Sequence, residues 1–460
     1  MNEDNVQRLR ETLRGEIVQP GDATYDEIRK VYNGMHDRRP ALIVLAAGVA
    51  DVMAAVEFAQ EVGLVLAVRG GGHSAPGFGT CDGGLVLDLR RMRGIRVDPE
   101  ERTVRAEGGC TLGDVNHATY AFGLATPFGI ASTTGIAGLT LGGGMGYLTR
   151  RCGLSCDNLL SADVVTADGT FLTCTPEREA DLFWALRGGG GNFGVVTSFE
   201  FRLHPIADIF GGPIFFPLDG DVVSAYRDFI LKAPEELGAL FAFTRAAPLP
   251  FLPEKWHGQP VSAVIACWSG AIEDGERALA PIKTWGEVIG AYVDRMPNPA
   301  LNSMFDALLP PGLQHYWKGN FARDLQDDAI EAHLEHAPNV PCIETGTFLY
   351  PMNGACQRVP SDGTAYAYRE ALFATVIGGA WRDPADNEQN MRWVREYDEA
   401  LRPYSEGSGY VNFMASEDQD RVQINYGQNY ERLIEIKNRY DPTNLFRLNH
   451  NIEPIPLASS

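Results

Sequence analysis

The sequence predicts an α+β protein of two or three domains, and three observations support this prediction. Its 460 residues, 45% of them hydrophobic, suffice for more than one buried core. Helical patterns alternate with short apolar runs typical of strands over residues 1–205. After residue 206, proline, tryptophan and longer helical stretches become more frequent. These changes indicate a second α+β domain at 206–410 and a C-terminal segment at 411–460.

The first 205 residues begin with two helical segments that form a cap. Residues 49–62 place apolar side chains at helical spacing, and 64–68 is a short run of valine and leucine typical of a buried strand. Ala167-Asp168-Gly169 is a turn signal that predicts a hairpin over 162–175. The other expected elements are helices at 6–13, 25–35, 112–122 and 182–187, and strands at 85–89, 95–97, 103–106 and 195–203.

The second domain is expected to mix helices with antiparallel strands. The patterns predict helices at 222–233 and 275–288 and strands at 261–268, 344–350 and 371–378. In the C-terminal segment, 429–440 has helical spacing. Asp441-Pro442 ends this helix because proline cannot continue the hydrogen-bond ladder.

Composition and charge exclude several classes of function. The formal net charge of −21 argues against nucleic-acid binding, which needs a surplus of Lys and Arg. No apolar window is long enough to span a membrane, and the polar start of the chain lacks a secretory signal, so we expect a cytoplasmic protein. The eight cysteines are expected to be free thiols. Without a second Cys pair or a His cluster at suitable spacing, no metal site is expected.

A glycine-rich turn follows the predicted strand at 64–68. Successive glycines allow a positive φ and bring backbone N–H groups close to a ligand. A cluster of amides beside an arginine suits a pyrophosphate, although a simple tight turn is an equal alternative. The residues of this turn are Arg69, Gly70, Gly71, Gly72, His73 and Ser74.

A second glycine-rich segment covers residues 135–147, where close backbone approach to something flat becomes possible. The alternative is close packing between layers of the protein. Two such segments suit an extended ligand with a phosphate centre and a planar ring. Residues 189–194 match G-x-G-x-x-G, but the predicted helix precedes and the strand follows. This order is the reverse of the dinucleotide fingerprint, so an NAD site is not expected.

Together these pieces resemble the FAD-dependent oxidases of the vanillyl-alcohol oxidase/p-cresol methylhydroxylase superfamily, specifically the berberine-bridge-enzyme-like branch. The resemblance covers about residues 35–205 and the last fifty residues, and the middle only in outline. The motifs that carry it are residues 68–74, 135–147 with 152–158, 181–195, Tyr410-Val411-Asn412-Phe413 and 426–452.

The resemblance implies an FAD-binding domain in two α+β subdomains, completed by the C-terminal segment, with an antiparallel sheet of the substrate domain over the flavin. It implies that His73 carries the flavin covalently. Many relatives add a cysteinyl link four residues before the Gly-Ile-Ala-Gly stretch, where this chain has Ala131, so a single linkage is expected. The expected flavin-binding residues beyond 69–74 are Thr134, Gly135, Gly138, Gly142, Gly143, Gly146, Asn192, Val195, Asn412, Asn449 and Asn451.

The candidate catalytic residues follow from strand periodicity and from the resemblance. Tyr410 and Asn412 share one face if their segment is extended, although Asn412 is equally a turn former. Glu344 and Tyr350 share one face of a predicted strand and are candidates for orienting the substrate or taking its proton. The alternative for Tyr350 is a core aromatic.

Two further positions bear on the chemistry. Several relatives carry a polar base where this chain has Ala374 and Val376, which favours an aromatic or apolar substrate. The resemblance implies that Thr134 lies at the flavin edge where dioxygen arrives, and the alternative is a strand-favouring residue beside Gly135.

The sequence therefore predicts an FAD-linked oxidase that removes a hydride from a C–OH or C–N centre of a small molecule. Dioxygen then takes up the electrons and yields hydrogen peroxide. The alternatives are a dehydrogenase with another electron acceptor and a flavin-binding protein without turnover. The expected assembly is a monomer or a small homo-oligomer.

Overall fold

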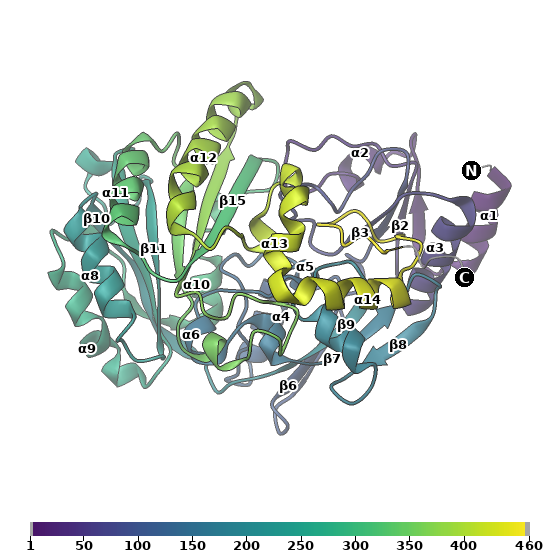
Figure 1. Ribbon diagram of the computed structural model, residues 1–460, viewed down its shortest axis with the longest axis horizontal. Coiled ribbons are helices and arrows are strands. Elements are labelled where there is room, and N and C mark those ends of the chain that lie inside the picture. The colour runs from purple at the N-terminus through teal and green to yellow at the C-terminus, as the bar shows by residue number, and fades with distance from the viewer. Residues whose placement is uncertain (1–2, 456–460) are drawn as a thin grey trace.

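The computed structural model describes residues 3–455, which form three β-sheets flanked by helices (Figure 1). Two smaller sheets come from the N-terminal part of the chain, and a large one comes from the middle. The C-terminal helices cross from the large sheet back to the N-terminal part. The α+β class and the antiparallel sheet of the central part are as the sequence predicts.

The four-stranded sheet carries the first glycine turn at the end of a parallel strand. Strands β2, β4 and β3 are parallel, whereas β1 runs antiparallel to β2. The sheet packs its apolar side chains against α3. In spatial order the strands are β1 (Glu16–Val18), β2 (Leu42–Leu45), β4 (Leu85–Asp88) and β3 (Leu66–Arg69), and the helices nearby in the chain are α1 (Glu3–Thr12), α2 (Tyr25–Ile28) and α3 (Val49–Val62).

The five-stranded sheet is antiparallel throughout. Its apolar face packs against helices from the N-terminal part and against α14 (Tyr430–Tyr440), which contributes Leu433 and Ile436. The C-terminal segment therefore completes this core. The strands are, in spatial order, β5 (Ile95–Asp98), β6 (Thr103–Glu107), β9 (Val195–Arg202), β7 (Leu159–Val165) and β8 (Phe171–Cys174), with α4 (Leu112–Tyr120), α5 (Ile136–Leu141), α6 (Thr149–Cys152) and α7 (Ala180–Leu186).

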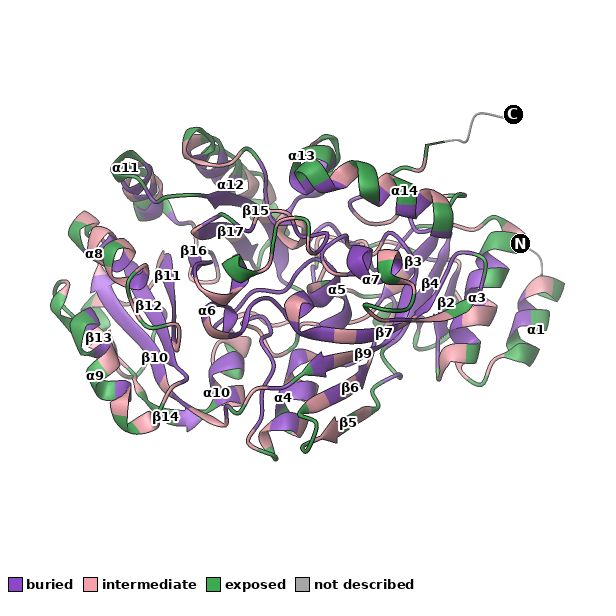
Figure 2. Cartoon of the chain, turned by 60° about the horizontal axis from the view of Figure 1, so that its bottom comes forward, coloured by how far each residue is buried: buried purple, intermediate pink, exposed green. Residues whose placement is uncertain are grey.

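The eight-stranded sheet is antiparallel and has two different faces. Helices α8 (Gly220–Ile230), α11 (Asp327–His336) and α12 (Asn387–Leu401) cover the outer face, and their exposed sides are visible in Figure 2. The inner face looks toward the N-terminal part. The strands are β13 (Gly290–Ala291), β10 (Asp208–Pro217), β12 (Pro260–Trp268), β11 (Leu237–Arg245), β16 (Gly346–Pro351), β17 (Phe373–Trp381) and β15 (Gln314–Ala322), with β14 (Asp294–Pro297) beside β10.

Several element predictions need correction. The helix expected at 25–35 ends at Ile28, and the side chain of Asn33 instead donates to the carbonyls of Ala75 and His315. The helix expected at 275–288 is α9 (Gly275–Leu279) followed by a 3₁₀ turn (Ala280–Thr284), because Pro281 has no N–H to donate. Strands β10, β11 and β15 and helices α11 and α12 were not predicted. The remaining helices are α10 (Asn298–Ser303) and α13 (Val422–Tyr426).

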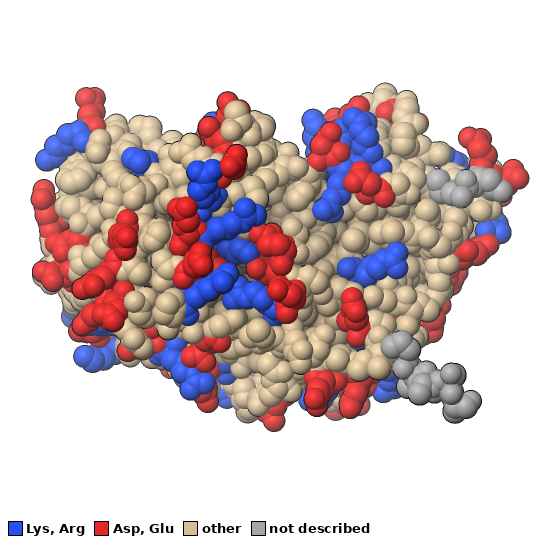
Figure 3. All heavy atoms as spheres, turned by 45° about the horizontal axis from the view of Figure 1, so that its top comes forward, with Lys and Arg blue, Asp and Glu red and all other residues tan. Residues whose placement is uncertain are grey.

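Other features concern the surface and the cysteines. None of the helices described is long and apolar enough to cross a membrane. All eight cysteines are free thiols. Within residues 3–455 there is no cluster of three or more His, Cys, Asp or Glu side chains that could hold a metal ion. On the face shown in Figure 3, acidic and basic side chains lie intermixed.

Candidate active site

A cavity of about 380 Å³ lies between the inner face of the eight-stranded sheet and the two glycine-rich segments. Strand β3 delivers one wall, residues 69–74, and the start of α5 delivers another. Strands β16 and β17 form the facing wall, and residues 449–450 of the C-terminal segment close one end. Segments far apart in the sequence therefore meet at one cavity.

His73 lines this cavity and has an aromatic neighbour on one face of its ring. Tyr32 stacks on it with 3.8 Å between ring centroids, and the Thr134 Oγ1 lies 3.4 Å from His73 Nδ1. Burial lowers the pKa of His73 to about 4, and a backbone hydrogen bond to Thr133 opposes the shift. The imidazole is therefore neutral at neutral pH.

The two glycine-rich segments pack directly against each other. A Cβ added at Gly71 would lie 2.3 Å from the backbone nitrogen of Gly135, so no side chain fits at this crossing. Gly138 and Gly191 differ, because a Cβ there would meet nothing within 4 Å. Both line the cavity and leave their backbone open to it. The glycines thus build a cradle with exposed main chain.

Several buried polar atoms along the cavity have no partner in the protein. They include the two ring nitrogens of His315, Nδ1 of His450, Oδ1 of Asn449, the hydroxyl of Tyr426 and Nε of Arg69. Burial lowers the pKa of His315 to about 3 and that of His450 to about 4, so both rings are neutral near pH 7. Since buried polar groups normally form hydrogen bonds, these atoms suit a large polar ligand.

Arg69 does not direct its charge at a ligand, which corrects the expectation from the sequence. Its Nη2 lies 2.8 Å from Asp88 Oδ2, and both side chains are almost fully buried. Its Nη1 donates to the carbonyls of Arg29 and Lys30. Asp88 therefore neutralises Arg69, which fixes the end of β3 under the glycine turn. Gly70, Gly71, Gly72 and Ser74, which the sequence predicts as flavin-binding residues, line the cavity.

Five of the predicted flavin contacts lie outside the cavity lining. Val195 packs into the core of the four-stranded sheet, and Val196 faces the cavity instead, since neighbouring strand residues point to opposite faces. Gly142, Gly143 and Gly146 make room for Asn412, for Tyr366 and for the carbonyl of Phe128. Asn451 donates its backbone N–H to Gln419 and lies behind the cavity.

Asn192 and Asn449 join the C-terminal segment to the cavity wall. The Asn192 side chain donates to the carbonyls of His450 and Gly189 and accepts from the N–H of Ile452, so it joins the glycine-rich loop to that segment. Asn449 donates to the carbonyl of Gly191. The buried ammonium of Lys437 donates to the Asn192 carbonyl and to Asp441.

Tyr410 and Asn412 come together through a turn and not through a strand. Residues Val411–Phe413 form a 3₁₀ turn, closed by the N–H of Phe413 donating to the Tyr410 carbonyl. Asn412 Nδ2 donates to the Tyr410 hydroxyl and to the carbonyl of Leu139. The extended segment expected from the sequence is thus wrong, yet both side chains line the cavity.

Glu344 and Tyr350 both line the cavity from the β16 side. Glu344 lies in the turn before β16, and its side chain is 5% exposed. Arg382 Nε donates to Glu344 Oε1 over 2.6 Å. Burial raises the pKa of Tyr350, so this residue is a neutral phenol near pH 7. Of the two, Glu344 alone is suited to accept a proton.

The facing wall from β17 carries no acid or base. Val376, Gly378 and Ala380 line the cavity, whereas Ala374 packs in the adjoining core. Strands β16 and β17 therefore present an apolar surface to the cavity, apart from the Tyr350 hydroxyl and Glu344 in the turn before β16, whereas β15 adds the polar ring of His315.

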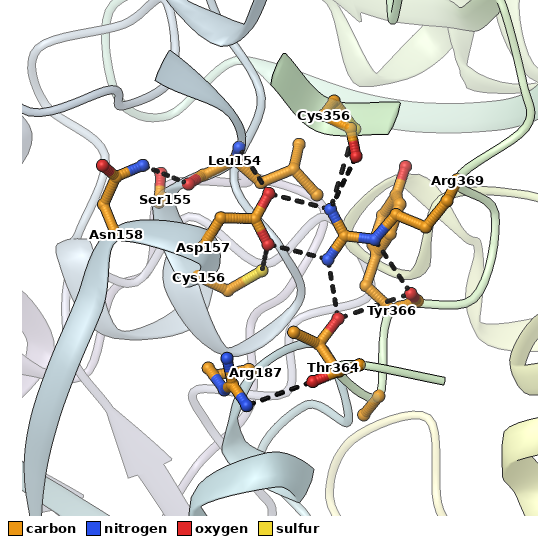
Figure 4. Close-up of polar contacts among 12 residues, drawn as sticks. Leu154, Ser155, Cys156, Asp157, Asn158, Arg187, Cys356, Thr364, Tyr366 and Arg369 are labelled. Carbon is orange, nitrogen blue, oxygen red and sulfur yellow. Dashed lines mark hydrogen bonds and ion pairs between the residues drawn. The ribbon is translucent and has the colours of Figure 1, made fainter. Parts of the chain in front are cut away.

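A buried ion pair joins the N-terminal part to the central part behind the cavity (Figure 4). Arg369 donates to both carboxylate oxygens of Asp157, over 2.8 and 2.7 Å, and to the hydroxyl of Thr364. Its guanidinium lies 4.9 Å from the ring centroid of Tyr366, the residue that packs on Gly143. This network holds the second glycine-rich segment against the large sheet.

Tyr32, Leu309, His315 and Trp317 are among the lining residues for which the sequence predicted no role. Tyr32 lies in a stretch expected to be helical, and the other three lie on or next to a strand that was not predicted. Their only sequence signal is the His-Tyr-Trp run at 315–317, which resembles ordinary core composition. His450, in contrast, belongs to the C-terminal motif at 426–452, which carries part of the family resemblance.

Comparison with known proteins agrees with this geometry. Two family models match: "FAD binding domain" over residues 40–175 and "Berberine and berberine like" over 409–453. An FAD-linked oxidoreductase of Dictyostelium discoideum is 32% identical, over 98% of this chain and 97% of the relative. The (R)-6-hydroxynicotine oxidase of Paenarthrobacter nicotinovorans is 30% identical, over 96% and 97%. The crystal structure of 6-hydroxy-D-nicotine oxidase from Arthrobacter nicotinovorans matches with a TM-score of 0.85 at 27% identity, over 96% of this chain and 98% of that one.

Proposed function

Because this chain belongs to the berberine-like family of FAD-linked oxidoreductases, we propose that it oxidises a C–OH or C–N centre of a small aromatic or otherwise apolar molecule and that dioxygen is the final electron acceptor. The carbon loses a hydride, and the neighbouring O–H or N–H loses a proton. The product is a carbonyl compound or an imine, and dioxygen gains two electrons and two protons to become hydrogen peroxide.

The main cavity fits FAD, and this fit is the observation that carries the proposal. The open backbone at Gly138 and Gly191 suits close approach of phosphates and a flat ring. The unpartnered atoms of His315, Asn449, His450 and Tyr426 suit a ligand rich in hydrogen-bonding groups. FAD bound there supplies the acceptor for the hydride and the route of electrons to dioxygen.

We place covalent attachment at His73, in agreement with its geometry. The ring lines the cavity, is neutral at neutral pH, and is held by Tyr32 and Thr134. A neutral imidazole has the free lone pair that bond formation requires. Ala131 lines the same cavity but has no thiol, so a single linkage through His73 is proposed.

The chain's own residues then hold the substrate and its proton. Glu344 lies on the wall opposite the glycine cradle, and its carboxylate is the proposed acceptor of the substrate proton. Tyr350, as a neutral phenol, is the proposed hydrogen-bond donor that orients the substrate. Tyr410 and Asn412 brace the second glycine-rich segment through Gly144 and Leu139, which fixes the distance between cradle and sheet.

An activity screen tests the proposal. Purified protein under air is supplied with a panel of aromatic alcohols and amines, and peroxide is measured alongside reduction of an artificial electron acceptor. Peroxide in a 1:1 ratio to product supports the oxidase. Product formed only with the artificial acceptor points to a dehydrogenase, and no product across the panel, with FAD bound, points to a protein without turnover.

A further inference from the structure

A second, smaller cavity of about 120 Å³ adjoins the main one. The two cavities share part of their walls, so they are neighbouring chambers of one site. The residues that line both are Tyr32, Ile130, Ala131, Leu309, Glu344 and Phe348. Glu344, the proposed proton acceptor, therefore stands at the boundary between the chambers.

The second chamber exists because two small residues face each other on the inner face of the large sheet. Ala242 of β11 and Ala263 of β12 are cross-strand partners. Phe215 of β10 lies beside Ala263, and Phe348 of β16 lies beside Ala242. One row across four strands thus has a phenylalanine at each end and two alanines between them, which leaves a hollow. All four side chains line the second chamber.

Phe348 forms the partition between the chambers. Its ring lies over two glycines that are themselves cross-strand partners, Gly346 and Gly378. A Cβ at Gly346 would be 3.1 Å from the Phe348 ring, and a Cβ at Gly378 would be 3.9 Å from it. Because the two glycines have no side chains, the Phe348 ring can lie over them and away from the alanine pair.

Most of the polar side chains around the second chamber are already bonded to the protein, and the hydroxyls of Thr133 and Tyr147 are the exceptions. Arg245 donates to the carbonyls of Val340 and Gly258, and Thr244 donates to the carbonyl of Thr345. Asp306 accepts from the backbone and hydroxyl of Ser132. The main cavity, in contrast, is lined by unpartnered polar atoms. The two chambers therefore suit different ligand chemistry, polar in the first and apolar in the second.

We propose that the second chamber is a substrate subsite that takes a ring-sized apolar group, while the carbon to be oxidised lies in the main cavity. Its volume of about 120 Å³ is close to that of the apolar cavity of about 150 Å³ that binds benzene in another protein. The substrate class is then a two-part molecule: an alcohol or amine carbon attached to one ring, with a second apolar ring beyond it. This inference rests on the proposed function and specifies its substrate.

The test measures binding separately from turnover. The FAD-loaded protein is titrated calorimetrically with biphenyl-4-methanol, whose second ring reaches the chamber, and with benzyl alcohol, which lacks that ring. The wild type should bind biphenyl-4-methanol at least tenfold more tightly. Equal affinities, or no binding of biphenyl-4-methanol up to its solubility limit, overturn the proposal.

Variants of the alanine pair locate the effect. Ala242→Val with Ala263→Val fills the chamber and should weaken biphenyl-4-methanol binding at least tenfold, with benzyl alcohol affinity unchanged within twofold. The matched control is Ala239→Val with Ala266→Val, the cross-strand pair on the opposite face of the same two strands, which should keep the wild-type ratio. If the filled variant keeps the ratio as well, the second ring lies elsewhere and the proposal is wrong.

A variant that enlarges the second chamber tests the proposal even if the variant that fills it does not fold. Leu240 also lines the second chamber, and Leu240→Ala enlarges it. This variant should gain at least fivefold in affinity for 4′-methylbiphenyl-4-methanol relative to biphenyl-4-methanol, and no gain contradicts the subsite. Peroxide is assayed in parallel. If the expected binding pattern is found but no peroxide forms, the oxidase is rejected and the subsite is kept. If both alcohols yield peroxide but bind equally well, the subsite is rejected and the oxidase is kept.

Discussion

The ring of Tyr32 lies flat against that of His73, with 16° between the ring planes. The other ring contact of Tyr32 is with His315, at 4.8 Å between centroids, and its hydroxyl donates to the carbonyl of Leu309. Tyr32 is therefore held by contacts with three separate segments of the chain, through His73, His315 and Leu309. It fixes the plane of the His73 imidazole, and this orientation decides whether a ring nitrogen can reach a ligand in the cavity.

The first prediction concerns the covalent flavin. His73→Ala should release all flavin when the protein is denatured, whereas the wild type should stay yellow and carry one FAD on the peptide containing His73. Tyr32→Ala should lower the covalently bound fraction at least fivefold, because the imidazole loses its stacking partner. Tyr32→Phe keeps the stack and should retain that fraction. Mass spectrometry of the flavopeptides gives the result, and a cysteinyl adduct anywhere in the chain would contradict the single linkage.

The second prediction is the pH dependence of the coupling reaction. The pKa of His73 is lowered to about 4, so the reactive neutral imidazole predominates from pH 8 down to about 5. The rate at which apoprotein acquires covalent FAD should be flat over that range and fall as pH drops through 4. An exposed histidine would instead lose rate through pH 6.5. Quenched time courses at several pH values decide between these profiles, and an inflection near 6.5 would show that His73 is not buried as described.

The third prediction concerns access of dioxygen. Thr134 lines the cavity next to His73, so Thr134→Leu should fill space there and slow reoxidation of the reduced protein at least tenfold. Reduction by substrate should change much less. Thr134→Val has a similar shape without the hydroxyl and separates the effect of space from that of hydrogen bonding. Stopped-flow mixing with dissolved oxygen measures both steps, and equal reoxidation in Leu and wild type removes Thr134 as the gate.

The fourth prediction concerns Glu344. Glu344→Gln keeps the size of the side chain but removes its capacity to take a proton, so kcat/KM for an identified substrate should fall at least 30-fold. Glu344→Asp should recover part of this loss. Glu388→Gln is the control, because Glu388 pairs with Arg392 on the exposed side of α12, outside both cavities. An unchanged kcat in Glu344→Gln would show that Glu344 is not the proton acceptor.

The fifth prediction concerns the ion pair between Asp157 and Arg369. Both side chains are at most 6% exposed, so Asp157→Asn leaves a buried positive charge without its partner. Breaking a buried pair in this way costs about 3–5 kcal/mol. Thermal unfolding should shift downward by several degrees, and the covalent flavin content should fall with it. The exposed pair of Arg8 and Glu61 is the comparison, and Glu61→Gln should change stability by less than about 1 kcal/mol.

The sequence predicted best what depends on local pattern. The apolar spacing predicted α3 with its correct bounds, Val49–Val62, because helical periodicity is a property of the segment itself. The two glycine-rich segments were also recognised, since their conformational freedom is a property of the residue type. That Gly71 and Gly135 cross each other could not be predicted, because the contact joins the turn after β3 to the residue before α5, far away in the sequence.

The errors have a common physical cause, because each depends on tertiary contacts that a local sequence pattern does not show. Arg69 was expected to meet a phosphate, but the position of Asp88 on the neighbouring parallel strand decides where its charge goes. Val195 was expected at the flavin from the family resemblance, whereas the structure packs its side chain in the core and places Val196 in the cavity lining. His315 and Tyr32 acquire their importance only through tertiary contacts, and no local pattern marks them. The division at residues 205 and 410 and the cytoplasmic location stay predictions.

The hydrogen bonds between Asn192 and the C-terminal segment impose an order on the making of the protein. Asn192 and His450 are 258 positions apart in the chain. At a synthesis rate of roughly 5–20 residues per second, about 13–50 s pass between the appearance of the two on the ribosome. During that interval the glycine-rich wall exists without the segment that closes it. Binding of the cofactor is thus expected to occur late in biogenesis, after the C-terminal segment that contains His450 has been synthesised.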